Sequence, residues 1–234
     1  MAWTAAVAGI LAGLLLSALQ AVWVGPLIRL AERYESGEAP LGLAGGTSGS
    51  AGGGSGNAGA DAPAPRAEWM PAEGLERIAY TVLADVLAAV GFALLLLAGM
   101  TLQGGAPSPA AGVLWGCAGY AAFVLGPALG LPPELPGAVS AALEERQIWW
   151  AGTVAATASG LALLAFAPRG WARALGALLL LAPHAVGAPE PPIAFAEPLP
   201  PALSAQFVAA VLVTSAAFWA VLGALCGWGL GRGR

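Results

Sequence analysis

Asp85 is the one acidic residue within a long hydrophobic segment of this 234-residue sequence, and His184 is its single histidine. A carboxylate at membrane depth is costly, so it normally faces the interior of a helix bundle, has a polar partner and often marks an ion or proton path. Imidazole and carboxylate ligands suit divalent Co, Ni or Zn, whereas thiolate-rich sites suit Cu(I) and iron–sulfur clusters. These two residues therefore predict a site that handles a divalent cation.

The depth of the polar residues in their segments points the same way. Arg77, Thr81 and Asp85 follow each other at intervals of four residues and form one stripe of a helix. With a rise of 1.5 Å per residue, Asp85 lies ~10 Å inside one membrane face and His184 ~6 Å inside it. Three other hydrophobic segments carry a polar residue at similar depth: Gln20, Thr153 and Gln206. The shared depth predicts a polar cavity that opens at this face.

Local roles remain open as alternatives for each of these residues. Asp85 pairs with Arg77 or bonds to Thr81 in one alternative. In a second, His184 caps a helix that Pro183, directly before it, disturbs. Hydroxyl and amide side chains also join helices within membranes by hydrogen bonds.

The composition places these residues in a membrane protein. The sequence is 58% hydrophobic and 9% charged, whereas about a quarter of the residues of a soluble domain are charged. Its nine basic residues do not form a cluster, and the net charge is −4, so a nucleic-acid partner is excluded. Cys117 and Cys226 stand alone in apolar segments and are expected to be small buried residues, not a disulfide.

Six segments reach the roughly 20 apolar residues that a helix needs to cross a bilayer. They are residues 5–27, 78–100, 110–131, 148–167, 171–188 and 204–230. We expect an all-α integral membrane bundle of about six transmembrane helices, which makes residues 1–234 a single polytopic domain. Residues 36–65, between the first two segments, are rich in Gly, Ser, Ala and Pro, which predicts a flexible linker.

An even number of crossings places both termini on one membrane face. The opposite face then holds the linker and the loops 132–147 and 189–203, and it receives every acidic residue except Asp85. The arginines are divided almost evenly between the faces, so the positive-inside rule decides little. We expect a multi-pass protein of the inner (plasma) membrane with both termini in the cytoplasm.

Small residues at a spacing of four predict the contacts between helices, because in lipid the packing energy comes from close backbone approach. The pairs are Gly9/Gly13 with Ser17, Gly112/Gly116, Gly126/Gly130 and Gly223/Gly227. Pro127 and Pro183 remove backbone donors within their segments, which predicts helix breaks. No HExxH, CxxC or GxSxG motif is present, so we do not expect an enzyme.

Several short motifs, in order along nearly the whole chain, resemble those of the CbtA family of cobalt transporter subunits. They are Pro26-Leu-Ile with Ala31-Glu-Arg-Tyr-Glu35, Gly74-Leu-Glu-Arg77, Leu129-Gly-Leu-Pro-Pro-Glu-Leu-Pro-Gly137, Arg146-Gln-Ile-Trp-Trp150, Pro183-His-Ala-Val-Gly-Ala-Pro189, Phe218-Trp219 and Leu222-Gly223. The resemblance implies cobalt uptake for cobalamin synthesis and a short, single-span, His-bearing partner similar to CbtB. It also implies roles for Glu134, Arg146, Gln147 and His184, which stand within the matching motifs.

Together these observations predict the permease-like subunit of a divalent metal uptake system. The transported ion is Co²⁺, with Ni²⁺ as the alternative, and no cofactor is expected to be bound permanently. Asp85, His184, Glu134 and Gln147 are the predicted metal ligands. The residues predicted to line or gate the cavity are Arg77, Thr81, Gln20, Thr153, Gln206, Arg146 and Pro183. A scaffold that assembles a small partner without transporting metal is the first rival, and a small intramembrane enzyme is the second.

Replacing residues 36–65 by a Gly/Ser segment of similar length should leave cobalt uptake by expressing cells unchanged. The segment holds no His, Cys or Met and supplies reach, not a folded core or metal ligands. Loss of uptake in a replacement variant that still reaches the membrane at the normal level would mean that the segment makes a necessary contact.

Overall fold

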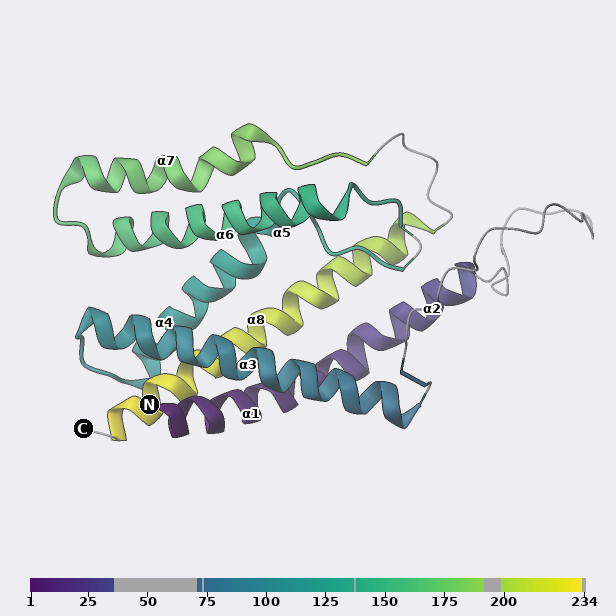
Figure 1. The fold of residues 1–234 in the computed structure, drawn as a ribbon, viewed down its shortest axis with the longest axis horizontal. Coiled ribbons are helices and arrows are strands. Elements are labelled where there is room, and N and C mark those ends of the chain that lie inside the picture. The colour runs from purple at the N-terminus through teal and green to yellow at the C-terminus, as the bar shows by residue number, and fades with distance from the viewer. Residues whose placement is uncertain (36–70, 73, 137, 192–198, 233–234) are drawn as a thin grey trace, which may run out of the picture.

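The computed structural model describes residues 1–35, 71–72, 74–136, 138–191 and 199–232. Every regular element within these residues is a helix, as Figure 1 shows, so the prediction of an all-α membrane bundle of about six helices is confirmed. The predicted linker 36–65 lies outside the described residues.

The helices follow the apolar segments of the sequence. The first crossing is α1 (Ala2–Leu19), the π-helical turn η1 (Gln20–Val24) and α2 (Gly25–Glu35), and the second is α3 (Leu75–Gln103). The third combines α4 (Pro109–Tyr120), the π-helical turn η2 (Ala121–Leu125) and α5 (Gly126–Ala128). It is followed by α6 (Leu143–Phe166), α7 (Gly170–Val186) and α8 (Pro201–Arg232).

Five helical segments of the described chain are long and apolar enough to cross a membrane, and α7 is shorter than the others. Its 17 residues extend ~26 Å, close to the ~30 Å thickness of the hydrocarbon core. It packs lengthwise against α6 as a helical hairpin, so the predicted segment 171–188 is a helix of the bundle at the lower limit of spanning length.

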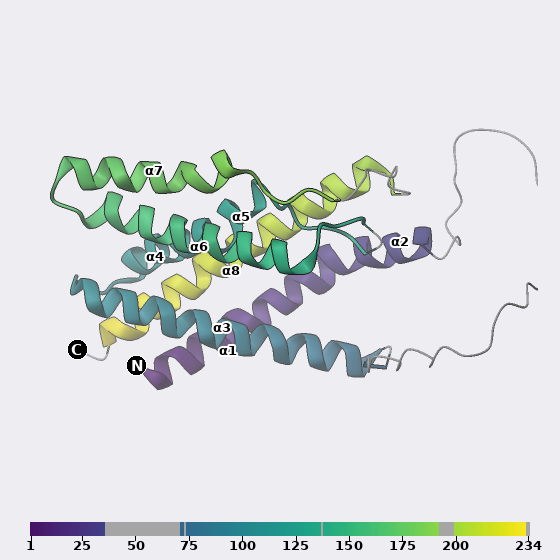
Figure 2. The same ribbon diagram turned by 45° about the horizontal axis from the view of Figure 1, so that its top comes forward.

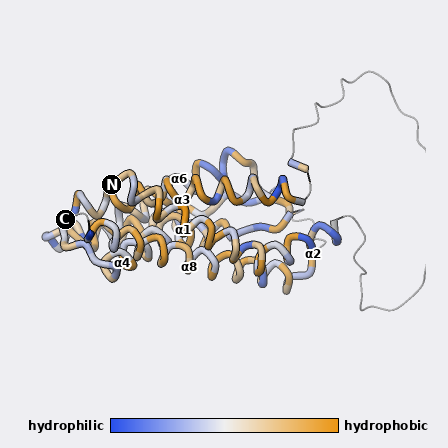
Figure 3. Tube along the Cα trace, turned by 90° about the horizontal axis from the view of Figure 1, so that it is seen from below, coloured by the Kyte–Doolittle hydropathy of each residue, from blue (hydrophilic) through white to orange (hydrophobic). Residues whose placement is uncertain are grey.

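The helices form three packed pairs. Figures 1 and 2 show the α6–α7 hairpin on one side, α1 with α3 on the other, and α4 crossing α8 between them. Both termini lie at the same end of the bundle, where a side chain at Gly229 of α8 would meet Thr4 of α1. Figure 3 shows hydrophobic residues along most of the length of the helices, as a lipid-facing surface requires.

Glycine contacts hold α4 against α8. A Cβ atom at Gly112 would lie 2.1 Å from the carbonyl oxygen of Gly223, and one at Gly116 would lie 2.2 Å from that of Trp219. In the opposite direction, a Cβ atom at Gly223 would lie 2.2 Å from the carbonyl oxygen of Gly112. The two backbones thus touch, and the predicted contact role of these glycines is confirmed.

Glycine contacts also hold the α1–α3 and α6–α7 pairs together. In the α1–α3 pair, a Cβ atom at Gly9 would lie 2.5 Å from Cγ2 of Val90, and one at Gly13 would lie 2.7 Å from the Cα atom of Val86. In the α6–α7 pair, a Cβ atom at Gly160 would lie 2.7 Å from the carbonyl oxygen of Gly176. Each pair therefore depends on positions where no side chain fits.

An aromatic cluster joins the pairs at the centre of the bundle. The ring centroid of Phe92 on α3 lies 5.0 Å from that of Phe123 in η2 and 4.8 Å from that of Trp219 on α8. Cys226 is fully buried beside this cluster, as predicted, whereas the expectation for Cys117 is wrong because its side chain is exposed on α4.

The prolines act differently from the predicted helix breaks. Pro127 follows the π-helical turn η2, and Pro26 follows η1 in the same way, each directly after a glycine. A proline lacks the N–H that the preceding turn needs, and in transmembrane helices a local π-helical adjustment can satisfy the backbone groups that it frees. The break predicted at Pro183 is wrong, because α7 continues through Pro183 to Val186.

Gly223→Ala should lower the melting temperature of the detergent-solubilised protein. Its Cβ atom would lie 2.2 Å from the Gly112 carbonyl oxygen, and such overpacking typically costs about 1–3 kcal/mol. Gly91→Ala is the matched control, since nothing lies within 4 Å of a Cβ atom at this helical position. Gly91→Ala should leave the melting temperature unchanged or raise it. Equal melting temperatures for the two variants would contradict the assignment of the α4–α8 contact.

Candidate functional site

His184 faces a pocket at the end of the bundle opposite the termini. It lies in the last turn of α7, which ends at Val186, and a φ of 87° at the following Gly187 turns the chain into residues 188–191. The pocket has a volume of about 440 Å³, and its polar lining comes from Glu134, Trp149, His184 and Glu190. The rings of His184 and Trp149 meet edge to face, with centroids 6.2 Å apart. We refer to this cavity as the His184 pocket.

Glu134 also borders a second cavity, of about 430 Å³, which we call the Arg146 pocket. Nη2 of Arg146 lies 3.0 Å from Oε2 of Glu134, and the Ser140 hydroxyl donates to the same carboxylate. Gln147 and Pro127 contribute to the lining of the Arg146 pocket. The ion pair therefore forms part of the boundary between the two cavities and holds Glu134 at the edge of both.

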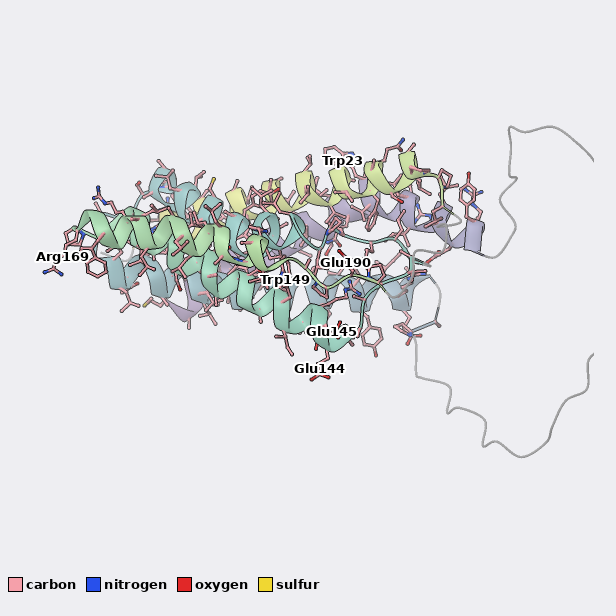
Figure 4. The ribbon with its side chains drawn as sticks, turned by 90° about the horizontal axis from the view of Figure 1, so that it is seen from above. Trp23, Glu144, Glu145, Trp149, Arg169 and Glu190 are labelled. Atoms are coloured by element: carbon pink, nitrogen blue, oxygen red, sulfur yellow. The ribbon has the colours of Figure 1, made fainter. Side chains whose placement is uncertain are left out.

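Figure 4 labels several residues near the His184 pocket and at both ends of the α6–α7 hairpin. Trp149 and Glu190 lie close together in this view, whereas Glu144 and Glu145, at the start of α6, point outward from the bundle and Arg169 lies at the opposite end. Glu144 and Glu145 belong to neither pocket. Only some of the carboxylates at this end therefore face the cavities.

The His184 pocket offers one imidazole and two carboxylates, a donor set that suits a borderline divalent cation. Within the described residues, however, no three His, Cys, Asp or Glu side chains gather closely enough to hold an ion. The arrangement fits an open vestibule in which water or further ligands complete the coordination. It does not resemble the closed ligand cage of a structural metal site.

Asp85 lies apart from both pockets. It is half-buried on α3, where the Ser17 hydroxyl of α1 donates to its Oδ2 at 2.6 Å. Arg77 and Thr81, which the sequence offered as partners of Asp85, make other contacts in the structure. Thr81 donates to the backbone carbonyl of Arg77 at 2.9 Å, and the Arg77 guanidinium pairs with Glu32 of α2 at 3.0 Å.

Neither of the two pockets is the shared cavity that equal depth predicts, and that cavity stays a prediction. Gln20 is half-buried at the start of η1, Gln206 is exposed on α8, and Thr153 is fully buried on α6, and none of them lines either pocket. Depth follows from position along a helix, but the direction of a side chain around the axis depends on which helix packs beside it. Asp85 faces α1, whereas His184 faces α6.

Three residues of these sites were not predicted from the sequence. Ser17 was expected to be a packing residue, and its spacing of four from Gly13 does place it on the face of α1 that meets Asp85. From the sequence, Trp149 stands only as part of the Arg146–Trp150 motif, and Glu190 only as one of the acidic residues assigned to this membrane face. Their roles depend on how α6 and α7 pair, so the sequence contained no direct signal for them.

Comparison with known proteins gives one match. A family model described as probable cobalt transporter subunit (CbtA) matches residues 1–231. No curated protein and no solved structure matches the chain.

Asp85→Asn should reduce cobalt uptake by roughly tenfold, equivalent to about 1.4 kcal/mol, while the protein reaches the membrane normally. The amide oxygen still accepts the hydrogen bond from Ser17, so the substitution removes the charge and keeps the contact. Ser17→Ala is the complementary variant because it keeps the charge and removes the donor. We expect it to retain most of the uptake. Normal uptake by Asp85→Asn would assign the carboxylate to helix packing alone.

Proposed function

The chain belongs to the CbtA family of probable cobalt transporter subunits, and from this premise we propose that it is the permease-like subunit of a cobalt uptake system that supplies cobalamin synthesis. The observation that carries the proposal is the His184 pocket, where the single imidazole of the chain faces the same cavity as Glu134 and Glu190. Nitrogen and carboxylate ligands match the preference of Co²⁺, and Ni²⁺ is the alternative ion.

The proposed mechanism begins with attraction of the cation. The carboxylates of Glu134 and Glu190, which line the His184 pocket, raise the local concentration of a divalent cation. His184 then coordinates the ion beside Glu134 and Glu190. Because a conducting site must release its ion as well as bind it, a weak and incomplete set of ligands favours passage.

Glu134 has a second role in this proposal. Its ion pair with Arg146 competes with an arriving cation for the same carboxylate, because the guanidinium lies 3.0 Å from Oε2. Binding of the cation releases Arg146, and departure of the cation restores the pair. Gln147, which lines the neighbouring Arg146 pocket, offers an amide oxygen once the ion has moved past Glu134.

Asp85 serves a separate step in the same proposal. It lies between α1 and α3 with Ser17 as its donor, away from the His184 pocket. A carboxylate at this depth suits an ion or proton site on the transport path. We therefore assign Asp85 to a later position on the path and not to the first coordination of the metal.

The subunit requires a partner, since one imidazole cannot complete the coordination of Co²⁺. We propose a short, single-span membrane protein with histidines, similar to CbtB, which brings further nitrogen ligands to the His184 pocket. The complex lies in the inner (plasma) membrane. Both termini face the cytoplasm, so the His184 pocket opens on the outer side of that membrane and receives external metal.

Uptake of radioactive cobalt by a transport-deficient host tests the proposal. Cells that express this chain with the CbtB-like partner should accumulate cobalt above cells that express the partner alone. A scaffold that only assembles its partner would give no such increase when the partner reaches the membrane at the same level without this chain. That outcome would exclude the permease role.

His184→Ala and His184→Gln should both lower cobalt uptake, by about tenfold or more, because neither side chain supplies an imidazole ligand. Glu190→Gln should lower it less, since water can replace one carboxylate. Glu144→Gln is the matched control, because Glu144 is an exposed glutamate near the same end of the bundle that lines neither pocket. Normal uptake by His184→Gln would show that the residue supplies a hydrogen bond and not a metal ligand.

A further inference from the structure

One face of α6 collects the buried side-chain nitrogen and oxygen atoms that lack a hydrogen-bond partner within the described part of the chain. Across the described part of the chain these atoms are Nε of Arg146, Nε1 of Trp149 and Oγ1 of Thr153. The three residues are spaced by three and four positions, so they lie on one stripe of the helix. Their shared position needs an explanation, because buried polar groups in proteins are almost always paired.

The unpaired hydroxyl of Thr153 differs from other threonine hydroxyls described in the helices. The hydroxyls of Thr81, Thr101 and Thr214 each donate to the carbonyl oxygen four residues earlier in the same helix. Thr153 is 0% exposed and makes no such bond. Thr214, which is 1% exposed, is therefore a matched comparison with the same burial and a satisfied hydroxyl.

The stripe faces the irregular segment of the third crossing. A Cβ atom at Gly130 would lie 2.4 Å from the Trp149 ring, and one at Gly126 would lie 3.0 Å from Oγ1 of Thr157. Thr153 lies between Trp149 and Thr157 on α6, so it is opposite the turn between Gly126 and Gly130. That turn contains Pro127, which has no backbone N–H to donate.

The donor and acceptor properties of the three unpaired atoms on α6 indicate which kind of partner can satisfy them. Arg146 Nε and Trp149 Nε1 are donors only, and a hydroxyl can both donate and accept. A metal ion cannot bind N–H groups directly, and an anion would be repelled by Glu134 beside Arg146. Water supplies the missing acceptor oxygen for the two N–H groups and can donate to or accept from the Thr153 hydroxyl.

We propose that this face of α6 and the η2–α5 segment enclose a seam of ordered water, which extends the cavities at His184 and Arg146 into the membrane-spanning part of the bundle. The seam begins at the pockets because Trp149 lines the first and Arg146 lines the second. It ends near Thr157, where α6 closes against Gly126. In its transport role, which rests on the proposed function, the seam solvates the cation as it leaves His184.

Cysteine accessibility tests the seam without requiring transport. All labelling variants are made in a Cys117→Ala background, which removes the exposed native thiol. Cys226 remains as a fully buried internal reference. Thr153→Cys and Thr214→Cys are treated in detergent with the small, water-soluble thiol reagent 2-aminoethyl methanethiosulfonate, and modification is followed by intact mass and peptide mapping. Thr153→Cys should react at least about ten times faster than Thr214→Cys, because the reactive thiolate forms only where water solvates it. Equal rates at the two positions, with both variants folded, would overturn the proposal.

Thr153→Val provides a second measurement that does not depend on a reagent. If the Thr153 hydroxyl were dry and unpaired, its replacement by a methyl group would remove a destabilising group and raise the melting temperature. With water bound, the substitution removes a hydrogen bond, and the melting temperature should fall or stay unchanged. A clear rise in Thr153→Val would therefore also overturn the proposal.

The seam and the transport function can fail separately. Rapid labelling of Thr153→Cys with no chain-dependent cobalt uptake would support the seam and contradict the proposed function. Cobalt uptake with Thr153→Cys as slow as Thr214→Cys would support the function and contradict the seam. When both hold, Co²⁺ bound at the His184 pocket should slow the labelling of Thr153→Cys, because the ion occupies one of the two pockets through which the reagent enters.

Discussion

Direct contact between helix backbones at glycine is the constraint on which the rest of the structure depends. Lipid gives little hydrophobic drive for helices to associate, so the packing energy must come from close approach. Here Gly112 and Gly223 bring α4 and α8 into contact, and glycines also mediate the α1–α3 and α6–α7 pairs. Because these positions tolerate no side chain, they decide which face of each helix turns inward. The direction of every polar residue follows from that choice.

This pairing separates the polar residues into two regions. Asp85 faces Ser17 because Gly13 brings α1 against α3 one turn away. His184 faces Trp149 because α7 packs along α6. The proposed metal ligand His184 and the intramembrane carboxylate therefore belong to different helix pairs, and the central pair α4–α8 lies between them. A transport cycle that uses both must connect them through the packing of α4 and α8.

The Gly-Pro steps after the two π-helical turns give the bundle its irregular backbone. One follows η1 in the first crossing and the other follows η2 in the third, and the second faces the polar stripe of α6. Irregular backbone is tolerated at membrane depth where protein or water satisfies the freed groups. The ion pair between Glu134 and Arg146, the unpaired donors of α6 and the turn at Pro127 thus lie in one part of the molecule.

The sequence by itself determined the class of the protein, its helices and the spacing of its helix contacts, because apolar length and small-residue spacing are local properties of the chain. It also predicted His184, Glu134, Arg146 and Gln147 as site residues, and each of them lines one or both of the two pockets. It could not place Asp85 with Ser17, separate Asp85 from His184, or find Glu190 and Trp149. Those relations depend on rotation about each helix axis and on which helices pair, and only the tertiary packing decides both. Pro183 illustrates the same limit, since the packing of α7 keeps a helix where the residue alone predicts a break.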